Sequence, residues 1–395
     1  MPIRYEEARA VVVRELTAWA RLPRTERIPL LKAAGRVLAQ EIRADRCYPT
    51  LDRTARDGFA VRSADLPGRL RLIGEVRAGQ RFTGRVGPGE AVEIMTGAPV
   101  PAGADSIIMV EHIRRDGDFI MFEKRVGIGD FINYRGGEAS VGALLLLPGT
   151  KLGYAEIAML AAVGHPHVDV FVQPRVSILA TGDELVEPGQ DVSDHQIRNS
   201  NAYSLAAQVA RAGGLAEVVG IARDDEAETR TLIEQMLQSD LLLLSGGVSA
   251  GKYDFVESAL KSLRAEIFFD RVAIQPGQPL VFGRVQEKFF FGLPGNPAST
   301  MITFELFARS AVEALSGARP LEPVFPLARL CSDYRHRPGL KRFLPAHLSP
   351  SAELQPIGWT GSSDIASLTR ANAFMVVDAD QTAWNAGDLM PVLMK

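Results

Sequence analysis

Four consecutive leucines, Leu241–Leu244, lead directly into a loop of glycines and hydroxyl side chains that ends at Asp254. A short apolar run bounded by turn residues predicts a strand that is buried on both faces of a sheet. Such strands belong to parallel sheets that carry helices on both sides, and ligands bind these sheets beyond the carboxyl ends of the strands. The loop after Leu244 is therefore the first candidate binding loop of the chain.

Strand-like and helix-like segments alternate around this leucine run. The expected strands are 168–172, 176–180, 218–222, 267–269, 280–285 and 289–292, and the expected helices are 199–212, 226–239, 255–263 and 297–315. Alternation of this kind predicts a parallel α/β domain covered by helices on both faces, which we place at residues 173–320.

The remaining sequence divides into three further parts. Residues 1–45 carry apolar side chains at helical spacing and a short expected helix over 29–34, so they predict a helical linker domain, completed by 143–172. Residues 46–142 are rich in glycine and short β-like runs, which predicts a small all-β module. Residues 321–395 predict a C-terminal β domain resembling a barrel. The expected fold class is thus α/β plus β.

Composition narrows the classes of function. The 395 residues are 46% hydrophobic and 23% charged with a net charge of −3, which is typical of a soluble globular protein and gives no general basic surface for nucleic acid. No apolar run is long enough to span a membrane, and the N-terminus lacks a basic-then-apolar leader. Two cysteines, Cys47 and Cys331, favour a reduced, cytoplasmic protein.

Four loops follow four of the expected strands, and in a parallel sheet they meet at one rim. Their candidate binding residues are Thr181, Gly182, Asp183, Glu184, Asp224, Ser245, Gly246, Gly247, Ser249, Asp254, Pro294, Gly295, Asn296 and Pro297. Glycines allow the backbone to approach an anion closely, and helix N-termini favour phosphate. Carboxylates repel phosphate unless a hard cation lies between them, so the four acidic side chains Asp183, Glu184, Asp224 and Asp254 predict bound Mg²⁺.

Two other interpretations of these loops stay open. Aspartate and glycine also gather in such loops simply because turns require them. The spacing from Gly246 to Lys252 matches a nucleotide-binding P-loop, but Tyr253 stands where that motif needs a Ser or Thr to bind Mg²⁺. The rim as a whole predicts a phosphoryl or nucleotidyl ligand bridged by a metal ion.

The order of these motifs resembles that of the molybdopterin molybdotransferases, which insert the metal in molybdenum cofactor biosynthesis. The resemblance covers essentially the whole chain. It rests on DGFA at 57–60, MTGAP at 95–99, TGDEL at 181–185, NSN at 199–201, RDD at 223–225, SGGVS at 245–249, LPGNP at 293–297 and GSS at 361–363.

The resemblance implies both an activity and a site. Adenylylated molybdopterin would bind at the rim, where Ser200 and Asn201 join the loops, and molybdate and Mg²⁺ would bind beside it. Metal insertion would hydrolyse the phosphoanhydride and release AMP. The catalytic residues implied by the resemblance are Asp57, Thr96, Glu184, Asp224 and Asp254.

The family also implies protein partners. Its members are elongated homodimers, in which the small β module of one subunit completes the site of the other. Asp57 and Thr96 lie in that module, separate from the rim. The adenylyltransferase that supplies the substrate and the molybdoenzymes that accept the cofactor are further partners to expect.

Molybdate is an oxyanion, so its site needs hydrogen-bond donors and cations. The candidate molybdate residues are Gln275, Gln278, Ser299, Arg337, Arg342 and Ser362. Many family members carry lysines where this chain has Gln275 and Gln278, and an aspartate where it has Ala139. These departures predict a weaker anion site rather than a different fold.

Two alternative functions fit the same motifs. The scaffold protein gephyrin carries a related module, so a non-catalytic molybdopterin-binding or scaffold module is one alternative. A molybdopterin adenylyltransferase, which has a similar α/β domain, is the other. The match over the β module and the C-terminal domain favours the molybdotransferase.

Overall fold

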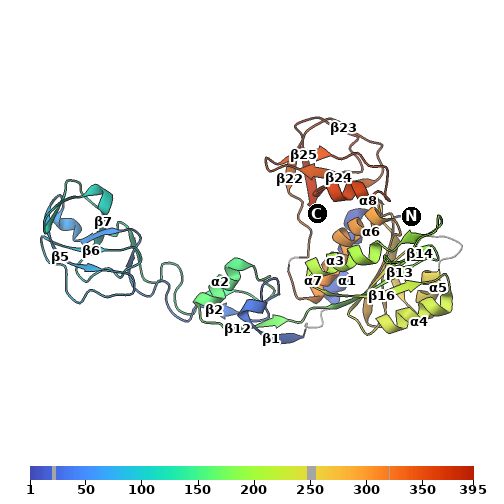
Figure 1. The fold of residues 1–395 in the computed structure, drawn as a ribbon, viewed down its shortest axis with the longest axis horizontal. Coiled ribbons are helices and arrows are strands. Elements are labelled where there is room, and N and C mark those ends of the chain that lie inside the picture. Colours follow the sequence, from blue (N-terminus) through green and yellow to red (C-terminus); the bar gives the residue numbers. More distant parts are fainter. Residues whose placement is uncertain (20–23, 247–254, 320) are drawn as a thin grey trace. The chain divides into compact units, whose positions relative to one another are not determined.

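A computed structural model describes residues 1–19, 24–246, 255–319 and 321–395 (Figure 1). The chain forms two compact units. One comprises Met1–Ala39, Pro148–Gly153 and His167–Lys395, and the other comprises Gln40–Leu147 and Tyr154–Pro166. The four-part division expected from the sequence is finer than these units, and its boundaries stay a prediction. Gly247, Ser249 and Asp254 lie outside the described residues.

A six-stranded sheet in the order β16-β13-β17-β21-β20-β18 forms the centre of the first unit. Its strands are β13 (Arg175–Thr181), β16 (Leu215–Ala222), β17 (Leu241–Ser245), β18 (Glu266–Arg271), β20 (Pro279–Val285) and β21 (Lys288–Leu293). The first four strands in this order run parallel, which confirms the prediction for them. Strand β20 pairs antiparallel with both β21 and β18, so the expected parallel arrangement does not hold at that edge. Only two residues separate β20 from β21, which is enough for a hairpin and too few for a crossover helix.

Helices cover both faces of this sheet, as expected. One face packs against α1 (Tyr5–Ala18), α3 (Asn201–Ala212), α6 (Pro297–Thr303) and α7 (Arg309–Leu315), and the other packs against α4 (Glu226–Met236) and α5 (Phe255–Ser262) (Figure 1). The leucine run serves both cores. Leu241 and Leu243 belong to the first core, and Leu242 and Leu244 belong to the second. All four are fully buried, because successive side chains of a strand point to opposite faces.

The N-terminal segment differs from the expected run of helices. Helix α1 forms as predicted, and it packs into the core of the α/β sheet, where the ring of Tyr5 lies 5.7 Å from the rings of Phe307 and Phe343. The helix expected over 29–34 is wrong, because β1 (Thr25–Pro29) occupies its start and only a 3-10 turn, Leu30–Lys32, follows. Strand β1 pairs with β12 (His167–Phe171), so β12 is not part of the α/β sheet.

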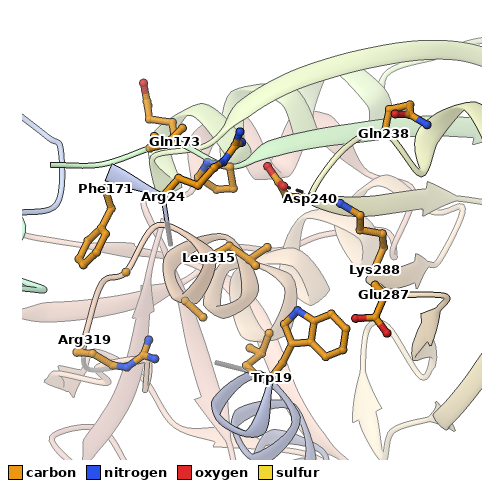
Figure 2. A pocket seen from close by; sticks show the side chains of 15 residues that line it. Trp19, Arg24, Phe171, Gln173, Gln238, Asp240, Glu287, Lys288, Leu315 and Arg319 are labelled. Carbon is orange, nitrogen blue, oxygen red and sulfur yellow. Dashed lines mark ion pairs between the residues drawn. The ribbon is translucent and has the colours of Figure 1, made fainter. Parts of the chain in front are cut away.

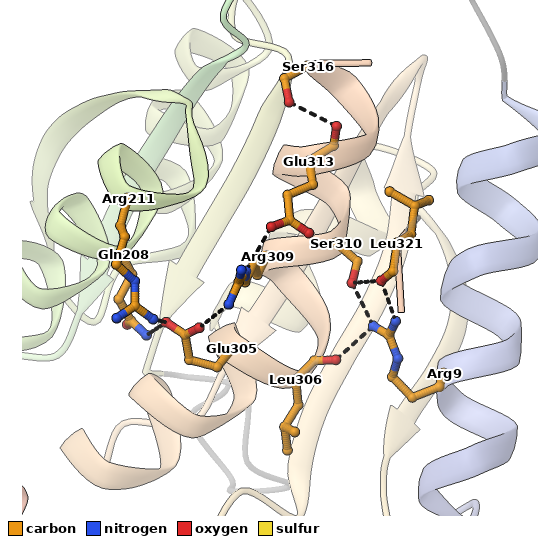
Figure 3. A network of polar contacts seen from close by, with 10 residues as sticks. All are labelled: Arg9, Gln208, Arg211, Glu305, Leu306, Arg309, Ser310, Glu313, Ser316 and Leu321. Carbon is orange, nitrogen blue, oxygen red and sulfur yellow. Dashed lines mark hydrogen bonds and ion pairs between the residues drawn. The ribbon is translucent and has the colours of Figure 1, made fainter. Parts of the chain in front are cut away.

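A polar network joins the helices on one face of the sheet (Figure 3). A π-helical turn, Phe304–Ala308, lies between α6 and α7 and carries Glu305, whose side chain is 4% exposed. Its carboxylate forms ion pairs with Arg211 of α3 at 2.8 Å and with Arg309 of α7 at 3.3 Å. Arg9 of α1 donates to the carbonyl oxygen of Leu306 in the same turn at 2.7 Å. The turn is therefore held by α1, α3 and α7 at once.

A β barrel follows the α/β part. Its strands are β22 (Leu327–Leu330), β24 (Lys341–Leu348), β25 (Glu353–Pro356), β26 (Ala373–Val377) and β28 (Leu389–Met394), with helix α8 (Ile365–Arg370) and the short pair β23 (Tyr334–Arg335) and β27 (Ala383–Trp384). The order β24-β25-β22-β28-β26 closes because β24 also pairs with β26, which confirms the barrel-like C-terminal domain. Strand β19 (Ile274–Gln275) comes from the α/β part and joins the barrel beside β24.

The second unit is rich in β-strands, as expected for residues 46–142. Its main sheet has the order β7-β4-β6-β5-β9-β8 and is built from β4 (Gly58–Val61), β5 (Gly68–Val76), β6 (Glu90–Ile94), β7 (Ser106–Met109), β8 (Arg114–Asp116) and β9 (Phe119–Phe122). Helix α2 (Tyr154–Ala162) and the strand pairs β2 (Ile42–Arg43) with β11 (Leu144–Leu146) and β3 (Arg53–Thr54) with β10 (Ile132–Asn133) complete it. Across the described ranges, no helix combines the length and the hydrophobicity needed to cross a membrane.

Candidate active site

A cavity of about 330 Å³ lies at the carboxyl ends of the parallel strands. The predicted binding residues that line it are Thr181, Glu184, Asn201, Ser245, Gly246, Pro294, Gly295, Asn296 and Ser299. They come from the loops after β13, β17 and β21 and from the starts of α3 and α6. Because these strands are parallel and adjacent, the structure brings these predicted loops together at one rim.

Asn201 joins the end of β17 to the loop after β21. Its Nδ2 donates to Ser245 Oγ at 3.0 Å and to the carbonyl oxygen of Gly295 at 2.7 Å. Its Oδ1 is buried and has no hydrogen-bond partner among the described residues, and the same is true of Thr181 Oγ1. A buried polar atom without a partner costs about 1–3 kcal/mol, so a ligand that bonds to either atom gains that amount.

The backbone conformation requires glycine at two positions of the rim. Gly182 has φ of 140° and Gly246 has φ of 92°, values that other residues rarely adopt. A Cβ at Gly246 would lie 2.7 Å from the carbonyl oxygen of Thr181, and one at Gly182 would lie 2.3 Å from a carboxylate oxygen of Glu184. Both positions therefore let neighbouring rim groups approach the backbone more closely than any side chain permits.

Three acidic side chains of the rim lie on neighbouring loops. The backbone N–H of Asp224 donates to Asp183 Oδ1 at 3.1 Å, and Glu184 lines the cavity. Arg223 fastens the loop after β13, because its Nη1 donates to the carbonyl oxygens of Asp183 and Leu185 at 3.1 and 3.0 Å. Sequence reasoning assigned Arg223 no role, although it is part of the RDD motif.

The donor chemistry of this rim fits a hard cation such as Mg²⁺. Carboxylate oxygens are its preferred protein ligands, and one or two of them together with substrate phosphates usually suffice. Within the described ranges no three metal-ligating side chains come together, and the fourth predicted ligand, Asp254, lies outside those ranges. Glu184 and Asp224 are the described residues that suit the ion.

The predicted molybdate residues separate into two groups. Gln275 on β19 stands opposite Arg342 on β24 in the strand register, and Arg342 Nε is buried without a partner in the described structure. At the start of α6, the N–H of Ala298 donates to the carbonyl oxygen of Ser362 at 2.9 Å, next to the buried Ser299. Ser299 lines the rim cavity, which places this second group at its wall.

Four further predicted site residues, Gln278, Ser200, Pro297 and Arg337, belong to neither of these two groups. Gln278 precedes Pro279, which also lines the rim cavity. Ser200 comes directly before α3, and its side chain makes no capping hydrogen bond. Pro297 is the first residue of α6. Arg337 is exposed in the segment between β23 and β24, and among the described residues no hydrogen bond or ion pair joins it to the other candidate molybdate residues.

Asp57 and Thr96 meet in the second unit. The backbone N–H and the hydroxyl of Thr96 both donate to Asp57 Oδ1, each at 2.6 Å. These two bonds hold the pKa of Asp57 below its usual range, because both favour the ionised carboxylate. Thr96 also lines a cavity of about 500 Å³ in this unit.

A larger cavity of about 610 Å³ lies at the opposite end of the parallel strands (Figure 2). Asp240, directly before β17, and Lys288, at the start of β21, line it together with Trp19 and Phe171. None of the residues named as its lining is a predicted site residue. Its size alone does not make it the active site, because the convergent loops and glycines lie at the rim.

The sequence matches three regions of one protein family. Residues 3–164 match the MoeA N-terminal region (domain I and II), residues 177–314 match a probable molybdopterin binding domain, and residues 328–394 match the MoeA C-terminal region (domain IV). The fold and the rim thus define a protein of the class that carries a molybdopterin-binding α/β domain.

Relatives over the whole length make the assignment specific. The molybdopterin molybdenumtransferase of Bacillus subtilis (strain 168) is 32% identical over 408 residues, covering 100% of this chain and 94% of that protein. The one of Nostoc sp. (strain PCC 7120 / SAG 25.82 / UTEX 2576) is 35% identical over 386 residues, covering 93% and 88%. The crystal structure of the molybdopterin biosynthesis MoeA protein from Pyrococcus horikoshii OT3 is 29% identical with a TM-score of 0.80, and both chains are fully covered. The chain belongs to the MoeA family of molybdopterin molybdenumtransferases and is a transferase of molybdenum cofactor biosynthesis.

Proposed function

We propose that the rim cavity binds adenylylated molybdopterin and that the enzyme transfers molybdate to its dithiolene, with hydrolysis of the phosphoanhydride and release of AMP. The observation that carries this proposal is the convergence of Thr181, Asn201, Ser245 and Gly246 on one cavity of a molybdopterin-binding domain. The free Asn201 Oδ1 and Thr181 Oγ1 offer bonds to a polar ligand. The substrate brings its own sulfur atoms, which suits a chain with only two cysteines.

The acidic side chains of the rim have a separate role in this proposal. Glu184, Asp224 and Asp254 hold Mg²⁺ beside the phosphoanhydride, with Asp183 supporting the loop that carries Glu184. Bound Mg²⁺ would neutralise the charge that develops on the phosphoryl oxygens. Asp183 already accepts the N–H of Asp224, so it fixes the spacing of the two loops.

Molybdate would bind at the wall formed by the start of α6. Ser299 and Ser362 would supply hydroxyl donors there, and Gln275, Gln278 and Arg342 would supply further donors from β19, the segment after it and the barrel. Arg342 brings the positive charge that the two glutamines lack. Arg337 is the second arginine that we assign to the anion.

We further propose that the active enzyme is a homodimer, in which Asp57 and Thr96 of one subunit complete the rim of the other. The support is that these two residues form a tight pair in a unit separate from the one that carries the rim. The adenylyltransferase and the molybdoenzyme acceptors are the protein partners that the activity requires.

The decisive experiment is to mix the purified protein with adenylylated molybdopterin, Mg²⁺ and molybdate and to measure AMP by chromatography. The proposal requires AMP release that depends on molybdate. A non-catalytic binding or scaffold module would retain the substrate without releasing AMP. An adenylyltransferase would instead consume ATP in the presence of molybdopterin, and either result would overturn the proposal.

A further inference from the structure

We propose that the cavity beside Thr96 in the second unit is a binding site for a tetrahedral oxyanion, with the guanidinium of Arg53 as its principal ligand. The cavity has a volume of about 500 Å³, large enough for such an anion together with part of the molecule that carries it. Its lining includes Arg46, Tyr48, Thr50, Arg53, Thr96 and Asn133. All belong to the second unit, so the site exists within one chain.

Arg53 provides a cation that the protein does not otherwise use. The pairing of β3 with β10 sets Arg53 opposite Asn133, and a backbone bridge to Pro99 fixes the same residue from the other side. Its Nη2 makes one long hydrogen bond of 3.4 Å to Thr50 Oγ1. It forms no ion pair with any described residue.

Arg46 is a second cation at the cavity, but it already has partners. Its Nε lies 3.4 Å from Asp45 Oδ2, and its guanidinium lies 5.8 Å from the ring centre of Tyr48. The Tyr48 hydroxyl donates to Asp45 as well, and this bond lowers the pKa of Asp45. Arg46 is thus held in place beside the cavity, while Arg53 is free to bind.

The donors around the cavity suit an oxyanion. A guanidinium offers two parallel N–H groups, which match two oxygens of a phosphate or a molybdate. The Thr50 hydroxyl accepts from Arg53, so its own proton is available, and no described residue bonds to the side-chain amide of Asn133. Thr96 contributes no donor, because its N–H and hydroxyl both bind Asp57. The described lining of the cavity carries one carboxylate, Glu138, against two arginines.

Two anions of the reaction share this chemistry. One is the phosphate of the adenylyl group, and the other is molybdate. The link between the site and the reaction rests on the proposed function, but the cavity and its arginines do not. Binding can therefore be tested without molybdopterin and without turnover.

Hydrogen exchange followed by mass spectrometry tests the site locally, so binding at the rim does not interfere. The full-length protein is incubated with inorganic phosphate, AMP or molybdate, and exchange is followed in peptides covering 46–56 and 132–139. We expect at least one anion to slow exchange there. In Arg53→Gln the anion concentration for half-maximal protection should rise tenfold or more. Arg53→Lys keeps the positive charge but lacks the two parallel N–H groups, so its half-maximal concentration should lie between those of Arg53→Gln and the unchanged protein.

Arg115→Gln is the matched control, because Arg115 is an exposed arginine of the same unit and pairs with Glu93 at 3.2 Å. It should leave the protection unchanged. Protection by phosphate and AMP identifies a phosphoryl site, and protection by molybdate alone identifies a metal-oxyanion site. No protection with any of the three anions, or equal protection in folded Arg53→Gln, overturns the proposal. AMP release in the separate turnover assay, without protection here, would retain the proposed function and remove only this site.

Discussion

Gln208 Nε2 on α3 donates a 2.7 Å hydrogen bond to Glu305 Oε1 in the π-helical turn after α6. The same amide donates to the carbonyl oxygen of Met301 at 3.0 Å, so α3 is tied both to α6 and to the turn that follows it. Both helices begin at the rim, where α3 presents Asn201 and α6 presents Ser299. The bond between Gln208 and Glu305 therefore helps to set the distance between two walls of the cavity.

Replacing Glu305 tests whether the hydrogen bond from Gln208 to Glu305 stabilises the fold (Figure 3). Glu305→Leu leaves the Gln208 amide and two arginines without their shared acceptor, so the free energy of unfolding should fall by about 1–3 kcal/mol. Urea unfolding measures the loss. Glu313→Leu is the control, because Glu313 pairs with Arg309 on its own helix and does not reach α3. An equal loss in both variants would mean that the contact between α3 and the π-helical turn adds nothing.

Removing a rim carboxylate tests the metal. Asp224→Ala should lower molybdate-dependent AMP release tenfold or more, which corresponds to about 1.4 kcal/mol in the activation barrier. EDTA should abolish the release by the unchanged enzyme. Asp194→Ala, which alters an exposed acid away from the cavity lining, should behave like the unchanged enzyme. Full activity in EDTA would exclude the proposed role of Mg²⁺.

Thr96 should control the titration of Asp57. Thr96→Val removes the hydroxyl donor, the first cause of the lowered pKa, so the pKa of Asp57 should rise toward its usual value. Since the pKa is lowered in the folded protein, the pair stabilises the fold above the ordinary aspartate pKa, and this contribution is lost as the pH falls through the lowered value. Carboxyl-carbon NMR measures the titration, with Thr50→Val as control. An unshifted titration in Thr96→Val would contradict the assignment.

Mixed dimers test whether the site is shared between subunits. An Asp57→Ala chain and an Asp224→Ala chain are each expected to be inactive, and mixing them should restore about a quarter of the activity, since half of the dimers carry one intact site. Native mass spectrometry confirms that mixed dimers have formed. If they form and no activity returns, Asp57 and Asp224 act within one chain.

Restoring lysines tests the glutamine positions. Gln275→Lys/Gln278→Lys places positive charge beside Arg342, so the molybdate concentration for half-maximal AMP release should fall, by a factor equivalent to about 1–3 kcal/mol. The gain should shrink at high salt. Gln235→Lys/Gln238→Lys adds the same charge near the amino-terminal end of β17 and should have no effect. An unchanged molybdate dependence would remove β19 from the anion site.

Much of the rim could be predicted because its signals are local. The leucine run identifies a buried strand, and glycines 182 and 246 stand where the backbone requires them. Parallel strands then bring distant loops together without further information. This is why Thr181, Ser245 and Asn296 were found together although they are far apart in the sequence.

Contacts between segments that are far apart in the sequence could not be predicted in the same way. The segment at 29–34 has helical residues, but Pro29 ends a strand that pairs with His167. The antiparallel edge of the sheet follows from the missing helix between β20 and β21, and the short spacing between these strands is the sequence signal for it. The bond between Gln208 and Glu305 joins residues 97 positions apart, and no local pattern marks it.

The single amide of Asn201 also limits how the rim can change. It holds Ser245, the last residue of β17, and Gly295, in the loop after β21, at the same time, so the end of one strand and the loop of its neighbour are not independent. An insertion that moved Gly295 would pull the amide away from Ser245. A loop after β21 taken from a relative would therefore have to keep the position of Gly295, with the asparagine retained.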